Sequence, residues 1–181
     1  MERKLCLRRK GDFMTIQEAI ETAMQYEQKI RDLYGEAARQ ASTPEVKRFF
    51  QMLSDDEQRH FDYLTEQLGE WKTSGKLKMK PLQSKIPALE GMDGEAAPVK
   101  ETLSEEDRGD VKQALGKALK AELETSDFYR RLTDEFSDDA KKMFAGFLAI
   151  EENHVAAVQA ELDYLNKSGY FFDVREFDME G

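Results

Sequence analysis

Apolar residues recur at alternating intervals of three and four along four segments of the chain. This spacing places them on one face of an α-helix, with charged and polar residues on the other faces. The pattern therefore predicts four long amphipathic helices. The stripes comprise Ile16, Ile20, Ala23, Glu27, Ile30, Tyr34 and Ala37; Val46, Phe50, Leu53, Glu57, His60, Leu64 and Leu68; Val111, Leu115, Ala118, Glu122, Thr125, Tyr129, Leu132 and Phe136; and Ala140, Phe144, Phe147, Glu151, His154, Val158, Leu162 and Leu165.

Helix start signals precede three of these stripes. Thr15 and Glu18 have the spacing of a capping box, in which each side chain bonds the other residue's backbone N–H. The segment Ser42-Thr43-Pro44 places hydroxyl groups before a proline that suits a first helical turn. Ser137 is followed by two aspartates, and negative charge in the first turn favours a helix start.

The helical pattern stops over residues 70–108, which hold three of the four prolines. We interpret this segment as a crossover that runs the length of a bundle, in preference to a functional loop. The bundle is predicted to span residues 14–166. Residues 1–13 are predicted to be a flexible arm. Residues 167–181 are an aromatic tail that either seals the end of the bundle or pairs subunits.

The second half of the chain repeats the first. An offset of 95 aligns the first and third stripes, and an offset of 94 aligns the second and fourth. Two repeated helical hairpins joined by a long crossover predict an all-α, antiparallel four-helix bundle. The aligned polar and aromatic pairs are Glu27 with Glu122, Tyr34 with Tyr129, Glu57 with Glu151, and His60 with His154.

Six of the aligned residues are ionisable side chains in the middle of apolar faces: Glu27, Glu57, His60, Glu122, Glu151 and His154. Each Glu-x-x-His pair places its two side chains next to each other on one helix face. Buried carboxylates at close range are strongly unfavourable without compensation. Two divalent cations would balance four carboxylates, and two neutral imidazoles would complete the ligand shells. The pattern therefore predicts a dinuclear metal centre.

Oxygen and nitrogen ligands without sulfur favour iron or manganese, with zinc as a substitute, and histidine argues against calcium or magnesium. Tyr34 and Tyr129 lie seven residues after their glutamates, too far along the axis to be direct ligands. Each either donates a hydrogen bond to an outer ligand oxygen or simply packs in the core. A helical interaction module without metal is the alternative for the whole chain.

Composition narrows the class of partner. The formal charge of −10 argues against nucleic acid and against an anionic membrane surface. No run of 18 apolar residues is present, which predicts no membrane span. Cys6 is the single cysteine, so the chain alone builds no disulfide and no four-cysteine iron site. We expect a cytoplasmic protein, because cysteine use fits a reducing compartment and residues 1–13 lack the apolar run of a signal peptide.

The ligand pattern resembles that of the ferritin-like di-iron carboxylate proteins over residues 14–166. Within that superfamily, the segments YEQKIRDLYGEAA and AELETSDFYRRL most resemble the rubrerythrin family. The resemblance implies a ferritin-like bundle with two iron ions held by four glutamates and two histidines. Two features depart from that family: the chain lacks a four-cysteine rubredoxin site, and Thr125 stands where many rubrerythrins carry a further carboxylate. With four glutamates, two histidines and no further carboxylate, the ligand set is closer to that of bacterioferritin-type centres.

The resemblance implies a non-haem di-iron oxidoreductase that reacts with hydrogen peroxide or O2. An external electron donor is then required, because the chain has no rubredoxin site of its own. One alternative is a ferroxidase or iron-storage protein, which needs a shell of many subunits. Another is a dimanganese catalase-like protein, since the ligands suit both metals. We expect a homodimer or a higher homo-oligomer.

Overall fold

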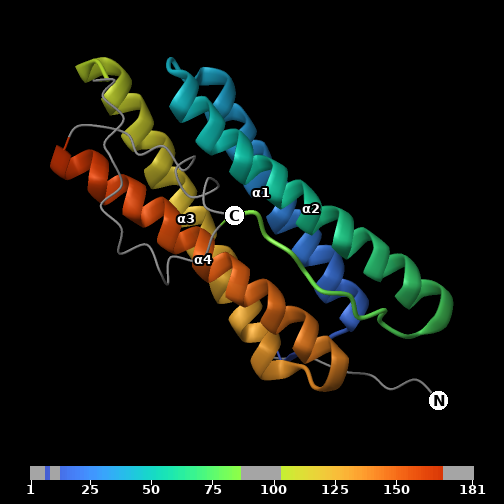
Figure 1. The fold of residues 1–181 in the computed structure, drawn as a ribbon. Helices are drawn as coiled ribbons and strands as arrows, with labels where there is room; N and C mark the ends of the chain where they lie inside the picture. Colours follow the sequence, from blue (N-terminus) through green and yellow to red (C-terminus); the bar gives the residue numbers. More distant parts are fainter. Residues whose placement is uncertain (1–6, 9–12, 87–102, 169–181) are drawn as a thin grey trace.

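Four long helices arranged as two hairpins form most of the described chain (Figure 1). In this computed structural model, residues 7–8, 13–86 and 103–168 are described. Helix α1 (Ile16–Gln40) packs on α2 (Pro44–Ser74), and α3 (Glu105–Glu135) packs on α4 (Asp138–Ser168). Helix α1 also contacts α3, which joins the hairpins. The predicted all-α four-helix bundle is confirmed.

Side chains at the helix termini explain where the first three helices begin. Thr15 and Glu18 form the predicted capping box at the start of α1. The Thr43 hydroxyl accepts from the Val46 N–H, with Pro44 in the first turn of α2. Ser104 caps α3 by accepting from the Asp107 N–H. These bonds satisfy N–H groups that have no partner within the helix.

The helices extend further into the predicted crossover than the sequence pattern indicates. Helix α2 continues to Ser74, and α3 begins at Glu105, so both enter the range 70–108. Gly75 ends α2 in the left-handed conformation, with φ of 67°, and its N–H donates to the Trp71 carbonyl. Glycine adopts this conformation without the steric cost that a Cβ brings. The connection between the helices is therefore shorter than predicted.

The first part of the crossover runs back along α2, antiparallel to it (Figure 1). The Gln67 amide donates to the Lys78 carbonyl at 2.8 Å and accepts from the Lys78 N–H at 2.9 Å. The Tyr63 hydroxyl donates to the Lys80 carbonyl at 3.2 Å. Further along, Ser84 contacts α2 at Asp56. The remainder of the crossover, residues 87–102, lies outside the described residues.

Two apolar clusters fill the bundle, and a layer of ionisable residues separates them. One cluster contains Phe50 and the other contains Phe144; we call them the Phe50 cluster and the Phe144 cluster. Along α1, Ala23 belongs to the Phe144 cluster and Ile30 to the Phe50 cluster, and Glu27 lies between them. The polar layer is thus enclosed by apolar residues at both ends.

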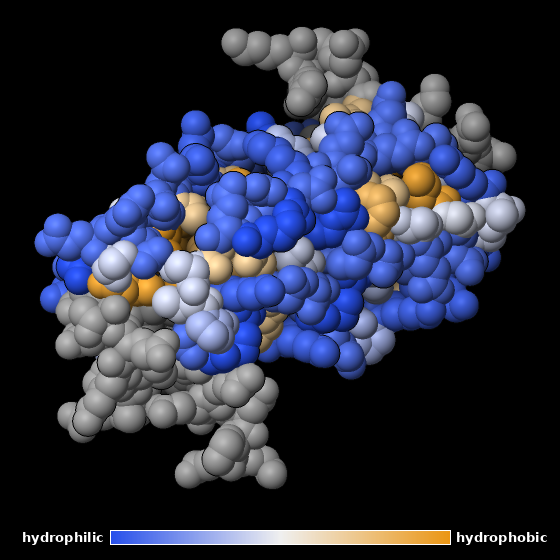
Figure 2. Space-filling view, turned by 90° about the horizontal axis from the view of Figure 1, so that it is seen from above, coloured by the Kyte–Doolittle hydropathy of each residue, from blue (hydrophilic) through white to orange (hydrophobic). Residues whose placement is uncertain are grey.

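The surface and the N-terminal segment add two observations. The face shown in Figure 2 is mainly hydrophilic, with hydrophobic residues visible in narrow strips. No helix in the described ranges is both long enough and apolar enough to cross a bilayer. Strand β1 (Leu7–Arg8) lies in the predicted arm and pairs antiparallel with β2 (Phe13–Met14), which lies at the boundary between the arm and the predicted bundle. The rest of that arm and the tail from residue 169 onward lie outside the described residues.

The two glycines near the end of α2 provide a matched test of its C-terminus. Gly75→Ala forces a Cβ into the left-handed region and should lower the free energy of unfolding by about 1–2 kcal/mol. Gly69 lies inside the helix, with open space for a new Cβ, so Gly69→Ala should raise the free energy of unfolding by about 0.5–1 kcal/mol. Urea unfolding of both variants measures the two effects. Changes in the free energy of unfolding that have the same sign in both variants would contradict the assignment of Gly75 as the cap.

Candidate metal centre

All four helices contribute to the polar layer, and the structure brings the six predicted residues together. Helices α1 and α3 each supply one glutamate, and α2 and α4 each supply a glutamate and a histidine three residues later. None of the six side chains has any exposed surface. They are Glu27, Glu57, His60, Glu122, Glu151 and His154.

The six side chains form two overlapping groups of four. In the first group, potential ligand atoms of Glu27 and His60 lie with those of the two shared glutamates, all within 4.8 Å of one another. In the second group, Glu122 and His154 lie with the same two glutamates at the same spacing. The shared residues are Glu57 and Glu151. Each group thus has one histidine and one glutamate of its own, the arrangement expected of two adjacent metal positions with two bridging carboxylates.

Both imidazoles turn the same ring atom towards the carboxylates. His60 Nδ1 lies 3.2 Å from Glu57 Oε2 and 3.3 Å from Glu27 Oε2. His154 Nδ1 lies 2.7 Å from Glu57 Oε1 and 3.7 Å from a Glu122 oxygen. The rings stack with their centroids 5.5 Å apart. Nδ1 is therefore the atom of each ring placed to bind a metal, and Nε2 points away from the four glutamates.

The two tyrosines resolve the choice that the sequence left open. Tyr34 on α1 donates a hydrogen bond to Glu122 on α3, and Tyr129 on α3 donates to Glu27 on α1. Each tyrosine therefore holds the glutamate of the other hairpin. Both are also fully buried and pack against phenylalanines, as core residues do. They orient the two unshared carboxylates without being placed to bind metal themselves.

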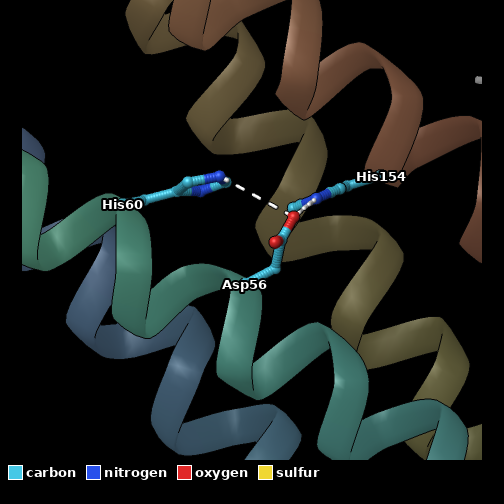
Figure 3. A group of neighbouring side chains, drawn as sticks. All are labelled: Asp56, His60 and His154. Atoms are coloured by element: carbon cyan, nitrogen blue, oxygen red, sulfur yellow. Dashed lines mark hydrogen bonds and ion pairs between the residues drawn. The ribbon is translucent and has the colours of Figure 1, made fainter. Parts of the chain in front are cut away.

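A buried aspartate that the sequence analysis missed, Asp56, lies beside the two histidine rings (Figure 3). Asp56 has no exposed surface, and its Oδ2 lies 3.0 Å from His154 Nε2 and 3.8 Å from His60 Nε2. Only the shorter distance is a hydrogen bond. Asp56 lies four residues before His60, on the same helix face, and this spacing is the one sequence signal that could have revealed it.

Charges in the layer are strongly coupled. Burial, together with the charges of neighbouring carboxylates, raises the pKa of Glu151 well above its usual value. Burial also raises the pKa of Glu27 to about 8, against the effect of His60. Burial acts to lower the pKa of His60, but the charge of Glu57 and the hydrogen bonds of the nearby carboxylates raise it to about 9. Without metal, bound protons therefore supply the positive charge that the carboxylates need.

The donor set fits a pair of divalent cations. Among the residues that the structure describes, both oxygens of Glu151 and Oε2 of Glu122 are buried without a hydrogen-bond partner. Such orphaned acceptors are costly in a protein interior unless something compensates them. Two divalent cations would match the charge of four carboxylates and occupy the unpaired oxygens and Nδ1 atoms. Oxygen and nitrogen ligands of this kind suit iron and manganese.

Comparison with known families agrees with this geometry. The rubrerythrin family model matches residues 8–68, which include α1 and most of α2 and therefore Glu27, Glu57 and His60. This part of the chain is therefore similar to rubrerythrins. No curated protein and no solved structure gives a significant match. The α3–α4 hairpin lies outside the family match, so the case for its three candidate ligands rests on the internal repeat and on the structure.

Replacement of a shared glutamate should separate stability from metal binding. Glu151→Gln keeps the size of the side chain and removes a carboxyl group whose ionised form is disfavoured in the folded state by burial and by the neighbouring carboxylates, which raise its pKa. We expect the metal-free variant to melt a few degrees higher than wild type, since 1 kcal/mol corresponds to about 2–4 °C at this chain length. We also expect it to lose most of the rise in Tm that Mn²⁺ gives wild type, because both metal positions lose a ligand.

Circular dichroism melts with and without Mn²⁺ measure both effects. Glu152→Gln is the matched control, because Glu152 is the next residue on α4 and forms an exposed ion pair with Arg130. A lower Tm of metal-free Glu151→Gln would show that the carboxylate is stabilising by itself. Retention of the full Mn²⁺ effect would show that Glu151 is not a shared ligand.

Proposed function

We propose that this rubrerythrin-like protein is a non-haem di-iron oxidoreductase that reacts with hydrogen peroxide or O2 at its centre of four glutamates and two histidines. The observation that supports this most is the pair of overlapping ligand groups that share Glu57 and Glu151. These two glutamates would hold two metal ions close together, so that two electrons could be delivered at one place. The family match supports the assignment to iron.

Iron bound as a ferrous pair supplies one electron from each ion, so that hydrogen peroxide and two protons give two waters. The residues of the chain supply the ligand atoms, hold the carboxylates by hydrogen bonds and enclose the site. His60 and His154 present Nδ1 to the carboxylate layer. Tyr34 and Tyr129 hold the unshared carboxylates. The Phe50 and Phe144 clusters enclose the layer, which strengthens each electrostatic interaction within it.

An external electron donor returns the centre to its reduced state. The sequence has a single cysteine, so the chain itself does not hold a four-cysteine iron site. Thr125 occupies the position at which many rubrerythrins carry a further carboxylate, and its hydroxyl donates to the Ala121 carbonyl of its own helix. The centre is therefore limited to six ligating side chains.

Anaerobic loading with ferrous iron, followed by rapid mixing, tests the proposal. We expect two iron ions per chain and fast oxidation of both by hydrogen peroxide or by O2, measured by stopped-flow absorbance and by colorimetric assay of the remaining ferrous iron. Glu57→Gln should lose stoichiometric binding because both positions share that carboxylate. Asp62→Asn, an exposed change on the same helix, is the control.

Four results would contradict the proposal. Binding of fewer than two iron ions by wild type would exclude the dinuclear site. Bound iron that stays ferrous with both oxidants would exclude the reaction. Manganese as the metal of protein isolated from its native host would replace the iron assignment with the dimanganese alternative. Assembly into a large shell that accumulates iron beyond two ions per chain would favour storage.

A further inference from the structure

Asp56 connects the crossover to the histidines of the centre. Its Oδ2 accepts from the Ser84 hydroxyl at 2.5 Å, and its Oδ1 accepts from the Lys85 N–H at 3.1 Å. On α2 itself, the Arg59 guanidinium pairs with Oδ1. The same carboxylate accepts from His154 Nε2 at 3.0 Å. Donors therefore surround both oxygens of this buried carboxylate, and two of them come from the crossover.

These contacts distinguish Asp56 from a metal ligand. Asp56, His60 and His154 do gather three potential ligand atoms within 4.8 Å. A cation placed there would lie close to the Arg59 guanidinium, which is already paired with Asp56. It would also compete with two hydrogen-bond donors from the crossover for the same oxygens. The carboxylate is arranged as an acceptor that supports the rings from behind, on the side opposite their Nδ1 atoms.

Ser84 is fixed by the segment on which it lies. Its hydroxyl also accepts from the Ile86 N–H at 3.0 Å, and the Ile86 side chain is buried in the Phe50 cluster. Closer to the end of α2, Gln67 holds both backbone groups of Lys78. The crossover is thus attached to α2 at several points between Lys78 and Ile86, and the turn at Ser84 is the point where it reaches the metal layer.

We propose that the crossover turn Ser84–Ile86 is a positioning element of the metal centre, acting through Asp56 on His154. An acceptor at Nε2 keeps the proton on that nitrogen and leaves Nδ1 free to bind a metal. The support is unequal, because Asp56 Oδ2 lies 3.8 Å from His60 Nε2, beyond hydrogen-bonding distance, and that nitrogen has no hydrogen-bond partner among the described residues. The metal position at His154 is therefore the better organised of the two and binds the more tightly. This inference rests on the proposed dinuclear centre.

Titration of the metal-free full-length chain with Co²⁺ tests the inference without any activity assay. Co²⁺ absorbance reports the ligand geometry, and calorimetry reports two affinities. We expect wild type to bind two Co²⁺ in two steps. Asp56→Asn should weaken the tighter step by about 10–100-fold, the usual effect of losing a partner of a ligating histidine, and should change its absorbance.

Ser84 provides an independent pair of variants. Ser84→Ala removes the hydroxyl that donates a hydrogen bond to Asp56. It should therefore weaken binding of the tighter Co²⁺ by a smaller factor than Asp56→Asn does. Ser84→Thr keeps the hydroxyl and should restore affinity and absorbance close to those of wild type. Asp55→Asn, an exposed neighbour on α2 that accepts only from Gln51 in the described hydrogen bonds, is the control for Asp56→Asn.

The outcomes separate the two proposals. Wild type that fails to bind two Co²⁺ would contradict the dinuclear centre, and this inference with it. Two-site binding that neither Asp56→Asn nor Ser84→Ala alters would contradict the positioning inference alone. Should Asp56→Asn not fold, as judged by circular dichroism, the comparison of Ser84→Ala with Ser84→Thr decides the inference by itself.

Discussion

Repulsion among four buried carboxylates is the constraint on which the rest of this structure depends. A layer that contains Glu27, Glu57, Glu122 and Glu151 without solvent contact would be strongly unfavourable by itself, because charge is costly in an apolar interior and like charges add to that cost. Protons on the imidazoles and carboxyls reduce the repulsion when metal is absent. Two divalent cations would balance the four negative charges. The apolar clusters at both ends exclude water from the layer, so the negative charge of the carboxylates has to be balanced within it. They also strengthen the attraction to any balancing positive charge, since charges interact more strongly away from water.

The internal repeat explains why the centre is almost symmetric. Each hairpin supplies one histidine, one shared glutamate and one unshared glutamate, and its tyrosine donates to the unshared glutamate of the other hairpin. This crossed bonding means that neither hairpin completes its own half of the site. The hairpins are therefore held together by the requirements of the centre as well as by apolar packing.

The sequence predicts the helices and the six candidate ligands that lie together in the layer, because both follow from periodicity within a helix. The capping box at Thr15 is equally local. The glutamate to which each tyrosine donates could not be predicted, because it depends on the register between α1 and α3, which a stripe within one helix does not determine. Asp56 was missed for another reason. The repeat identifies residues in pairs, and the position in α4 that corresponds to Asp56 holds Ile150. Ser84 lies in a crossover that has no counterpart at all.

The absence of a second copy of Asp56 follows from the charge of the layer. Asp56 carries a negative charge beyond the four that two divalent cations balance, and Arg59, three residues later on α2, supplies the matching positive charge. At the corresponding positions of α4, Ile150 replaces the acid and Asn153 replaces the base. The acid and the base are thus present together in one hairpin and absent together in the other, as expected if neither is tolerated alone near the buried layer. The one carboxylate retained lies on α2, where the crossover can reach it. In the proposed centre, this difference between the two hairpins would make the two metal positions unequal within an otherwise repeated structure.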